Sequence, residues 1–460
     1  MVFSDPDVFF GPVKSARGVS TADYVRRLAD ENTPPTDGIA PIFEGETAEK
    51  TAIAGAGLMG RSIAAAFLRV GKPVLLYDSL PEARAAAPQR IAEELAFQRA
   101  AGENPTDEER DQAQKRVGRL LEIAEEPAAL DRCGTILETI VEKLRIKQKF
   151  YQTLDAVLTG PKFLLSNTST IQITDLAAAL ETTRFLRPTR FCGFHFFHPV
   201  RKRSLVEVIR GKQTQTATLA YAEQLARQID KRPISVGDGP GFLVNRLLNP
   251  YLDESMTLLL EGVPLTRIES VCRRFGMEMG PFRIMDEIGL DVTMHSGWTF
   301  YKAFPDIITA PALLPALIDD NRLGRKNGRG FFLYNRTGNW DGDGQIDPEL
   351  DTLLARVRGT RNVPEKTVLD ESFAVRGEKI SDTMIAARIF GGILFEAHRI
   401  LRDRIVSSTE EIDRALLFAL GFPASKGGIE FWADSLGPER LALLAKTLAP
   451  LSAKFRPELP

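Results

Sequence analysis

The stretch that decides the fold is Lys50–Asp78, KTAIAGAGLMGRSIAAAFLRVGKPVLLYD. A short apolar run comes first and is followed by the motif Gly55-x-Gly57-x-x-Gly60. An apolar-periodic stretch comes next, and then a second apolar run that ends at Asp78. This order predicts a strand, a tight turn, a helix and a second strand, which is the context in which GxGxxG binds a dinucleotide.

Each part of this motif has a physical role. Gly55 permits the tight turn, Gly57 lets the backbone approach a pyrophosphate, and Gly60 allows the helix to pack closely on the strand. The pyrophosphate is expected at the N-terminus of the helix that begins near Leu58, where free N–H groups attract anions. Asp78 follows at the end of the second strand, where a carboxylate accepts the ribose hydroxyls of NAD and repels the 2′-phosphate of NADP. The predicted cofactor is therefore NAD; a flavin is disfavoured because nothing downstream resembles a second flavin-binding segment.

Composition narrows the function class. A chain of 460 residues suggests about three domains. Lys+Arg number 59 and Asp+Glu 61, a net charge of −2, so no broad basic field favours nucleic acid. No apolar run reaches the ~18 residues of a membrane-spanning helix, and the N-terminus does not read as a signal peptide. Four histidines and three widely spaced cysteines predict no metal site and no disulfide framework, which favours the cytoplasm.

The rest of the chain predicts an α/β Rossmann-type domain followed by two related all-α domains. Further strands are expected at 135–139, 163–166, 191–197 and 204–209, and a helix cap at Thr106. Two helical regions carry similar patterns about 145 residues apart, which indicates an internal duplication. The predicted organisation is an N-terminal arm or linker (1–48), an NAD-binding domain (49–238), a helical domain (239–335), a linker (336–375) and a second helical domain (376–460).

One histidine is a candidate catalytic base. His195 lies in the apolar run FHFF, where a histidine is more often an ordinary core residue. The next predicted strand is spaced so that an antiparallel pairing brings Glu207 beside it. A histidine oriented by a carboxylate next to a nicotinamide can take the hydroxyl proton while a hydride leaves the alcohol carbon.

Two further candidates are polar residues near strand and helix ends. Ser169 belongs to SNTST, residues 166–170, at the expected carboxyl end of a strand and thus at the cofactor crevice. Ser169 or Thr170 can equally cap the next helix. Asn245 follows Gly239-Pro-Gly241 on a predicted helix, where an asparagine alone is usually solvent-exposed.

Taken together, the motifs resemble a known family. GAGLMG, SNTSTIQIT, GFHFFHPV with LVEVI, DGPGFLVNRLL and MGPFRIMDEIG occur in the order typical of L-3-hydroxyacyl-CoA dehydrogenases. LGRKNGRGFF, followed by a second helical repeat, is more specifically similar to the dehydrogenase half of the bacterial multifunctional β-oxidation enzyme (alpha subunit). The resemblance covers about residues 48–440.

The resemblance implies roles for individual residues. The general base is His195, with Glu207 as its partner. Ser169 and Asn245 hold the 3-oxygen of the substrate and help to order the nicotinamide. The implied cofactor contacts are Gly55, Gly57, Met59, Gly60, Asp78, Val141, Glu142, Lys147, Ser169 and His198; for Glu142 and Lys147, the alternative is a solvated helix start. Trp432 falls where the multifunctional enzymes often carry a tyrosine that touches the acyl-CoA.

The sequence also departs from the family pattern. Position 198 is histidine where the family usually has asparagine; a neutral imidazole can still donate one hydrogen bond, so activity is expected to survive. Thr139 stands where a small alanine is usual. Only about 50 residues precede the first Rossmann strand, too few for the enoyl-CoA hydratase domain of the multifunctional enzyme, so hydratase activity is not expected.

The expected function is NAD-dependent oxidation of (3S)-3-hydroxyacyl-CoA to 3-oxoacyl-CoA in fatty-acid β-oxidation. Two alternatives stay open: a related dehydrogenase that uses a free β-hydroxyacid, and a catalytically idle NAD-fold subunit that docks a hydratase or thiolase. The expected partners are the acyl-CoA substrate and a separate enoyl-CoA hydratase or thiolase, with no nucleic acid and no integral membrane contact.

Overall fold

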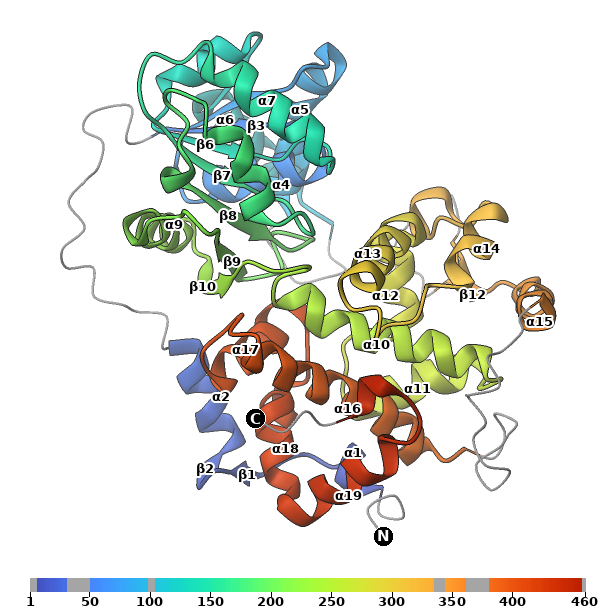
Figure 1. Cartoon of the computed structure of the whole chain (residues 1–460). Coiled ribbons are helices and arrows are strands. Elements are labelled where there is room, and N and C mark those ends of the chain that lie inside the picture. Colours follow the sequence, from blue (N-terminus) through green and yellow to red (C-terminus); the bar gives the residue numbers. More distant parts are fainter. Residues whose placement is uncertain (1–5, 31–49, 98–103, 335–343, 361–379, 457–460) are drawn as a thin grey trace. The chain divides into compact units, whose positions relative to one another are not determined.

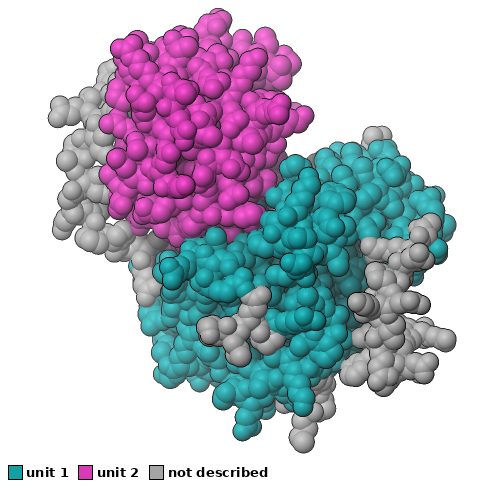
Figure 2. All heavy atoms as spheres, in the orientation of Figure 1, with its two compact units in different colours: residues 1–30, 243–460 teal, residues 31–242 magenta. Residues whose placement is uncertain are grey.

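A computed structural model describes residues 6–30, 50–97, 104–334, 344–360 and 380–456. The chain divides into two compact units (Figure 2). One comprises Glu31–Phe242 and is called the sheet unit below; the other, the helical unit, joins Met1–Asp30 to Leu243–Pro460. Both ends of the chain therefore belong to the helical unit.

The sheet unit is built on one eight-stranded sheet with the spatial order β10-β9-β8-β7-β6-β3-β4-β5. Its strands are β3 (Thr51–Ala54), β4 (Val74–Tyr77), β5 (Leu121–Ala124), β6 (Thr135–Glu138), β7 (Phe163–Ser166), β8 (Phe191–Phe196), β9 (Leu205–Arg210) and β10 (Arg232–Gly237). Neighbouring strands in this sheet are parallel except β8 and β9, which are antiparallel. The predicted Rossmann-type architecture is confirmed, and β5 and β10 are strands that the sequence did not predict.

The described residues of the sheet unit also form the helices α4 (Leu58–Arg69), α5 (Pro81–Ala96), α6 (Asp107–Leu120), α7 (Leu144–Asp155), α8 (Ile173–Ala177) and α9 (Thr216–Gln228). Figure 1 labels all of these helices except α8. Helices α4, α5 and α6 pack on one another, α7 packs on α8, and α9 packs on β8, β9 and β10. The predicted cap of α6 is confirmed, because Thr106 and Glu109 form a reciprocal capping box. Strand residues such as Ile53, Leu137 and Phe194 are fully buried, as expected for a sheet covered on both faces.

The register of the parallel strands places several polar segments at one edge of the sheet. Ala54 at the end of β3 is opposite Glu138 at the end of β6, and Glu138 is opposite Ser166 at the end of β7. β8 runs parallel to β7 and leaves the sheet at the same edge. The glycine-rich turn, the residues after Glu138 and the residues after Ser166 therefore all emerge at the carboxyl edge, where open α/β sheets bind ligands.

The helical unit contains most of the remaining elements. They are α10 (Val244–Leu260), α11 (Leu265–Phe275), α12 (Pro281–Ile288), α13 (Leu290–Ala303), α14 (Leu313–Asp319), β11 (Phe332–Leu333), β12 (Gln345–Ile346), α15 (Leu350–Thr360), α16 (Asp382–Arg402), α17 (Thr409–Ala415), α18 (Ile429–Leu436) and α19 (Pro438–Leu448). None of the helices in the described residues has the length and apolarity needed to cross a membrane.

The N-terminal segment of the helical unit is structured. Residues 6–30 form α1 (Asp7–Phe10), the two short strands β1 (Ser15–Ala16) and β2 (Val19–Ser20), and α2 (Thr21–Asp30). The region 336–375, predicted as a linker, contains β12 and α15. Residues 336–343 and 361–375 of this region lie outside the described part of the chain.

Candidate active site

The glycine-rich turn joins β3 to α4 and gives its three glycines different surroundings. Gly55 has φ +113°, and a Cβ there would lie 2.7 Å from the backbone oxygen of Thr139. A Cβ on Gly60 would lie 1.9 Å from the backbone oxygen of Gly55. A Cβ on Gly57 would meet no atom within 4 Å, so the backbone at this position is open to a ligand. Packing requires two of the glycines, and the third leaves room for a phosphate group.

The start of α4 and the end of β4 fit the phosphate and ribose of a dinucleotide. No side chain caps the N-terminus of α4, whose first N–H groups attract anions. Asp78 follows β4, and its carboxylate accepts hydrogen bonds from the backbone N–H of Ala56 (2.7 Å) and of Leu80 (2.9 Å). A carboxylate offers about four acceptor positions, so capacity remains for ribose hydroxyls. Met59 is partly buried against the core of the sheet unit.

A histidine and a glutamate form a buried pair on the two antiparallel strands. His195 in β8 is directly opposite Glu207 in β9, as the spacing predicted. His195 Nδ1 lies 2.7 Å from Glu207 Oε2. Glu207 is fully buried and His195 is 5% exposed, with its ring beside those of Phe197 and Phe242. Glu207 thus engages Nδ1, and the other ring nitrogen of His195 is Nε2.

The loop after β7 is wrapped around one carboxylate. Glu142 Oε1 accepts hydrogen bonds from the Thr168 hydroxyl (2.6 Å), the Ser169 N–H (2.8 Å) and the Ser169 hydroxyl (3.3 Å). Burial disfavours ionisation of Glu142, but Lys147 and these hydrogen bonds outweigh it and hold the pKa of Glu142 below its ordinary value of 4.5. Glu142 therefore fixes the position of Ser169. Neither Ser169 nor Thr170 is the N-cap of α8, whose first N–H groups instead donate to the Asp238 carboxylate.

Behind this loop lies a buried carboxylate that the sequence analysis did not single out. Glu138, the last residue of β6, accepts hydrogen bonds from Lys147 Nζ (2.5 Å), the Tyr151 hydroxyl (2.7 Å) and the Ser166 hydroxyl (2.8 Å). Lys147 is 1% exposed and also lies 3.3 Å from Glu142 Oε2, so its ammonium links the two carboxylates. The only signal in the sequence is an acid inside the apolar run TILET.

The same loop is tied to the strand that carries the histidine. The side-chain oxygen of Asn167 accepts a hydrogen bond from the N–H of Phe196, 2.9 Å away and next to His195 in the chain. Of the other predicted cofactor contacts, Val141 is 58% exposed and His198 is exposed just after β8. The structure thus brings the predicted sheet-unit residues to one edge, in agreement with the sequence pattern.

Two predicted site residues belong to the helical unit. Asn245 is partly buried in the first turn of α10. Trp432 in α18 has no exposed surface, and its indole N–H donates to the backbone oxygen of Val8 at 3.3 Å. Their contacts with substrate stay predictions, and for Trp432 the structure shows a side chain packed in the core.

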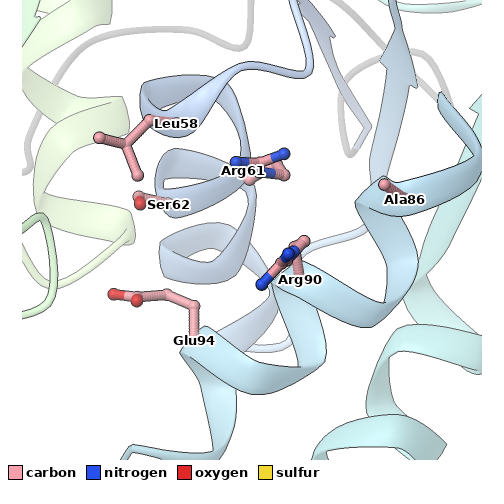
Figure 3. Close-up of a pocket in the computed structure, with 6 residues that line it drawn as sticks. All are labelled: Leu58, Arg61, Ser62, Ala86, Arg90 and Glu94. Carbon is pink, nitrogen blue, oxygen red and sulfur yellow. The ribbon is translucent and has the colours of Figure 1, made fainter. Parts of the chain in front are cut away.

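A separate cavity of about 350 Å³ lies between α4 and α5 (Figure 3). Arg61 and Arg90 line it together with Glu94, Leu58, Ser62 and Ala86. Burial and the neighbouring Arg90 lower the pKa of Arg61 below its ordinary value. The cavity does not include the His195–Glu207 pair. Among the described residues, no three or more histidine, cysteine or acidic side chains are grouped so that they could hold a metal ion.

Comparison with known proteins covers both units. The family model "3-hydroxyacyl-CoA dehydrogenase, NAD binding domain" matches residues 50–239, and "3-hydroxyacyl-CoA dehydrogenase, C-terminal domain" matches residues 241–334. The fatty acid oxidation complex subunit alpha of Pseudomonas aeruginosa is 32% identical over 408 residues, which are 88% of this chain and 53% of that protein. The chain thus spans about half the length of the curated relatives it matches.

Solved structures agree with this relationship. 3-Hydroxybutyryl-CoA dehydrogenase from Escherichia coli is 25% identical with a TM-score of 0.70, over 89% of this chain and 96% of that chain. (S)-3-Hydroxybutyryl-CoA dehydrogenase from Ralstonia eutropha is 32% identical with a TM-score of 0.55, over 63% of this chain and 99% of that chain. The family's NAD-binding domain and its C-terminal domain are both present, and so the chain belongs to the 3-hydroxyacyl-CoA dehydrogenase family of oxidoreductases.

Proposed function

We propose that this chain oxidises (3S)-3-hydroxyacyl-CoA to 3-oxoacyl-CoA with NAD, in the β-oxidation of fatty acids. The observation that carries the proposal is the buried His195–Glu207 pair, 2.7 Å apart, in a domain whose family model is NAD-binding. Oxidation of a secondary alcohol requires removal of the hydroxyl proton and transfer of a hydride from the same carbon. The pair supplies the first of these.

His195 is the general base in this proposal. Nε2 takes the proton from the 3-hydroxyl group, while the Nδ1 proton points to Glu207 and keeps the ring in the tautomer that has its lone pair on Nε2. When the proton arrives, the Glu207 carboxylate stabilises the imidazolium. Bound NAD supplies the acceptor for the hydride from C3, so that the two electrons of the C–H bond leave with it and a C=O bond forms.

Ser169 and Asn245 are proposed to hold the 3-oxygen. Support for Ser169 comes from its attachment to Glu142 at the carboxyl edge of the sheet, where its hydroxyl is held in a fixed place. The support for Asn245 is the family resemblance alone. Both groups stabilise negative charge that develops on the oxygen as its proton leaves.

NAD rather than NADP is the proposed cofactor. The open backbone at Gly57, the uncapped start of α4 and the Asp78 carboxylate fit a pyrophosphate and an unphosphorylated ribose. Met59, Val141, Glu142 and His198 complete the proposed contacts with the cofactor. Lys147 is proposed to affect the cofactor only by positioning Glu142, because its ammonium already contacts oxygens of Glu138, Ile140 and Glu142.

A separate enoyl-CoA hydratase or thiolase is proposed as a partner, because the P. aeruginosa relative is named as a subunit of a fatty acid oxidation complex. Widely spaced, buried free cysteines support action in the reducing cytoplasm.

The test is NADH formation from (3S)-3-hydroxybutyryl-CoA, followed by absorbance, in the wild-type chain and in His195→Ala. The matched control is His398→Ala, since His398 also lies beside a glutamate (3.6 Å from Glu430) but in the helical unit. We expect activity to be lost only in His195→Ala. Full activity of His195→Ala refutes the base assignment. Equal turnover of the free 3-hydroxyacid favours the alternative dehydrogenase, and NAD binding by calorimetry without turnover at any chain length favours an idle subunit.

A further inference from the structure

Helices α10 and α16 of the helical unit carry the same charges at the same spacing. Arg246 in α10 pairs with Glu396 in α16 (2.7 Å), and Arg388 in α16 pairs with Glu254 in α10. In each helix the arginine precedes the glutamate by eight residues. The two helices therefore contact each other reciprocally, as two copies of one element do across a twofold interface.

The helix pairs α11–α12 and α17–α18 share a second contact, between a buried acid and the start of the next helix. In α11, Glu269 accepts a hydrogen bond from the N–H of Phe282 (2.9 Å), and a Cβ on Gly280 would lie 2.1 Å from its carboxylate. In α17, Asp413 accepts hydrogen bonds from the N–H groups of Glu430 (2.9 Å) and Phe431 (3.0 Å). A Cβ on the glycine before α18, at position 428, would lie 2.2 Å from the Asp413 carboxyl carbon. A buried acid thus anchors the start of the next helix in both places.

The first copy, α10–α12, is covered by chain that follows it directly. Asp286 in α12 accepts hydrogen bonds from the N–H groups of Phe331 and Phe332, each at 3.0 Å. The Arg283 guanidinium stacks over the Phe332 ring at 4.2 Å. The strand pair β11–β12, which contains Phe332, therefore rests on α12. A cavity of about 420 Å³ remains there, lined among others by Glu269 and Arg283.

In the second copy, α16–α18, the corresponding positions contact the N-terminal segment. Phe431 lies three residues after the glycine that begins its helix, as Arg283 does in the first copy. The Phe431 ring stacks on the Tyr24 ring of α2 at 4.2 Å. The Tyr24 hydroxyl donates to Asp413 at 2.9 Å. Asp434, which corresponds to Asp286, accepts a hydrogen bond from Arg17, next to the strand pair β1–β2.

Buried polar groups of the second copy depend on the same segment. Lys426 is 1% exposed, and its ammonium donates to the backbone oxygens of Phe9 (2.6 Å) and Gly11. Trp432 donates to Val8, and its ring lies 5.7 Å from that of Phe9. Without these partners a buried ammonium and an indole N–H would lose their hydrogen bonds, which is costly in an apolar core.

We propose that α17 and α18 form an interaction surface whose partner is the chain's own residues 6–30, and that this segment gives the second helical copy the cover that β11–β12 gives the first. On this view the second copy is complete only when residues 6–30 are in place, whereas the first copy is covered by β11–β12. This proposal is independent of the proposed catalytic activity.

Hydrogen exchange measured by mass spectrometry on the full chain tests the proposal, with α12 as internal reference for α17–α18. Helix α11 is not used as the reference, because its Arg274 lies over the Phe10 ring at 4.1 Å. The variants are a deletion of residues 1–30, Tyr24→Ala, and the control Arg26→Ala, whose exposed side chain pairs with Asp23 of the same helix. We expect exchange in α17–α18 to rise about tenfold or more in the deletion and in Tyr24→Ala. Exchange in α12 should not change, and a synthetic peptide of residues 6–30 should restore protection to the deletion variant.

Unchanged exchange in α17–α18 after deletion overturns the proposal, and so does an equal rise in both copies. If the deletion variant does not fold, the comparison of Tyr24→Ala with Arg26→Ala decides in the intact chain: the same exchange in α17–α18 for both variants contradicts the proposed role of the segment.

Discussion

Replacing Glu207 by glutamine tests the proposed base most sharply, because it changes the charge and almost nothing of the shape. The wild-type carboxylate lies 2.7 Å from His195 Nδ1 and is fully buried, so no water replaces it. A hydrogen bond to a charged group is worth about 1.5–3 kcal/mol. Since 1.36 kcal/mol is tenfold in rate, loss of this stabilisation of the imidazolium lowers kcat roughly ten- to 150-fold.

A second effect acts in the same direction. A glutamine can turn its amide N–H toward Nδ1, which places the ring proton on Nε2 and removes the lone pair that accepts the substrate proton. The fall in kcat is therefore expected at the upper end of that range, about 100-fold. KM for acyl-CoA should change little, because Glu207 acts through His195 and is proposed to touch no substrate atom.

The assay is steady-state NADH formation from (3S)-3-hydroxybutyryl-CoA at saturating NAD. Glu223→Gln is the matched control, since Glu223 lies on the outer helix α9 and pairs with Arg227 at 3.3 Å. Circular dichroism of each variant separates a loss of chemistry from a loss of fold. A fall in kcat of less than about threefold for Glu207→Gln would refute the argument that the carboxylate stabilises the charged base.

Three further predictions follow from the geometry. Gly57→Ala should leave the unfolding midpoint near wild type yet weaken NAD binding in calorimetry, whereas Gly60→Ala should lower the midpoint, because its Cβ would lie 1.9 Å from a backbone oxygen. Lys147→Met leaves the buried Glu138 and the partly buried Glu142 without their cation, which should cost about 3–5 kcal/mol in denaturant unfolding. Lys149→Met, exposed on the same helix, should cost little. Burial raises the pKa of the Asp413 carboxyl group from 3.8 to about 8. The stability that this protonated group contributes is therefore complete below pH ~4 and is lost as the pH rises through 8. Thermal unfolding between these pH values should show a smaller loss of stability for Asp413→Asn than for wild type.

Much of the sheet unit is predictable from sequence because its determinants are local. Six of the eight strands are apolar runs that can be recognised alone, whereas β5 (LEIA) and β10 (RPISVG) contain charged residues, a proline or a glycine that mask them. The His195–Glu207 pairing was predictable because the two strands are close in sequence and the side-chain alternation of an antiparallel pair fixes which residues face each other.

The parts that sequence did not reveal depend on distant residues. Glu138 accepts hydrogen bonds from side chains of α7 and β7, and the sequence of its own strand does not indicate these donors. The role of the N-terminal segment is more remote still, because Tyr24 and its partner Asp413 are 389 residues apart in the chain. Local periodicity carries no information about such contacts, and the segment therefore read only as an arm or linker.

In the proposed reaction a hydride moves from C3 of a 3-hydroxyacyl-CoA to NAD. The most direct measurement uses (3S)-3-hydroxybutyryl-CoA deuterated at C3 and analyses the products by mass spectrometry. We expect one reduced nucleotide for each 3-oxoacyl-CoA formed, with the deuterium in the nucleotide. Absence of reduced nucleotide across a panel of acyl chain lengths, or oxidation that releases the deuterium to water, would contradict it.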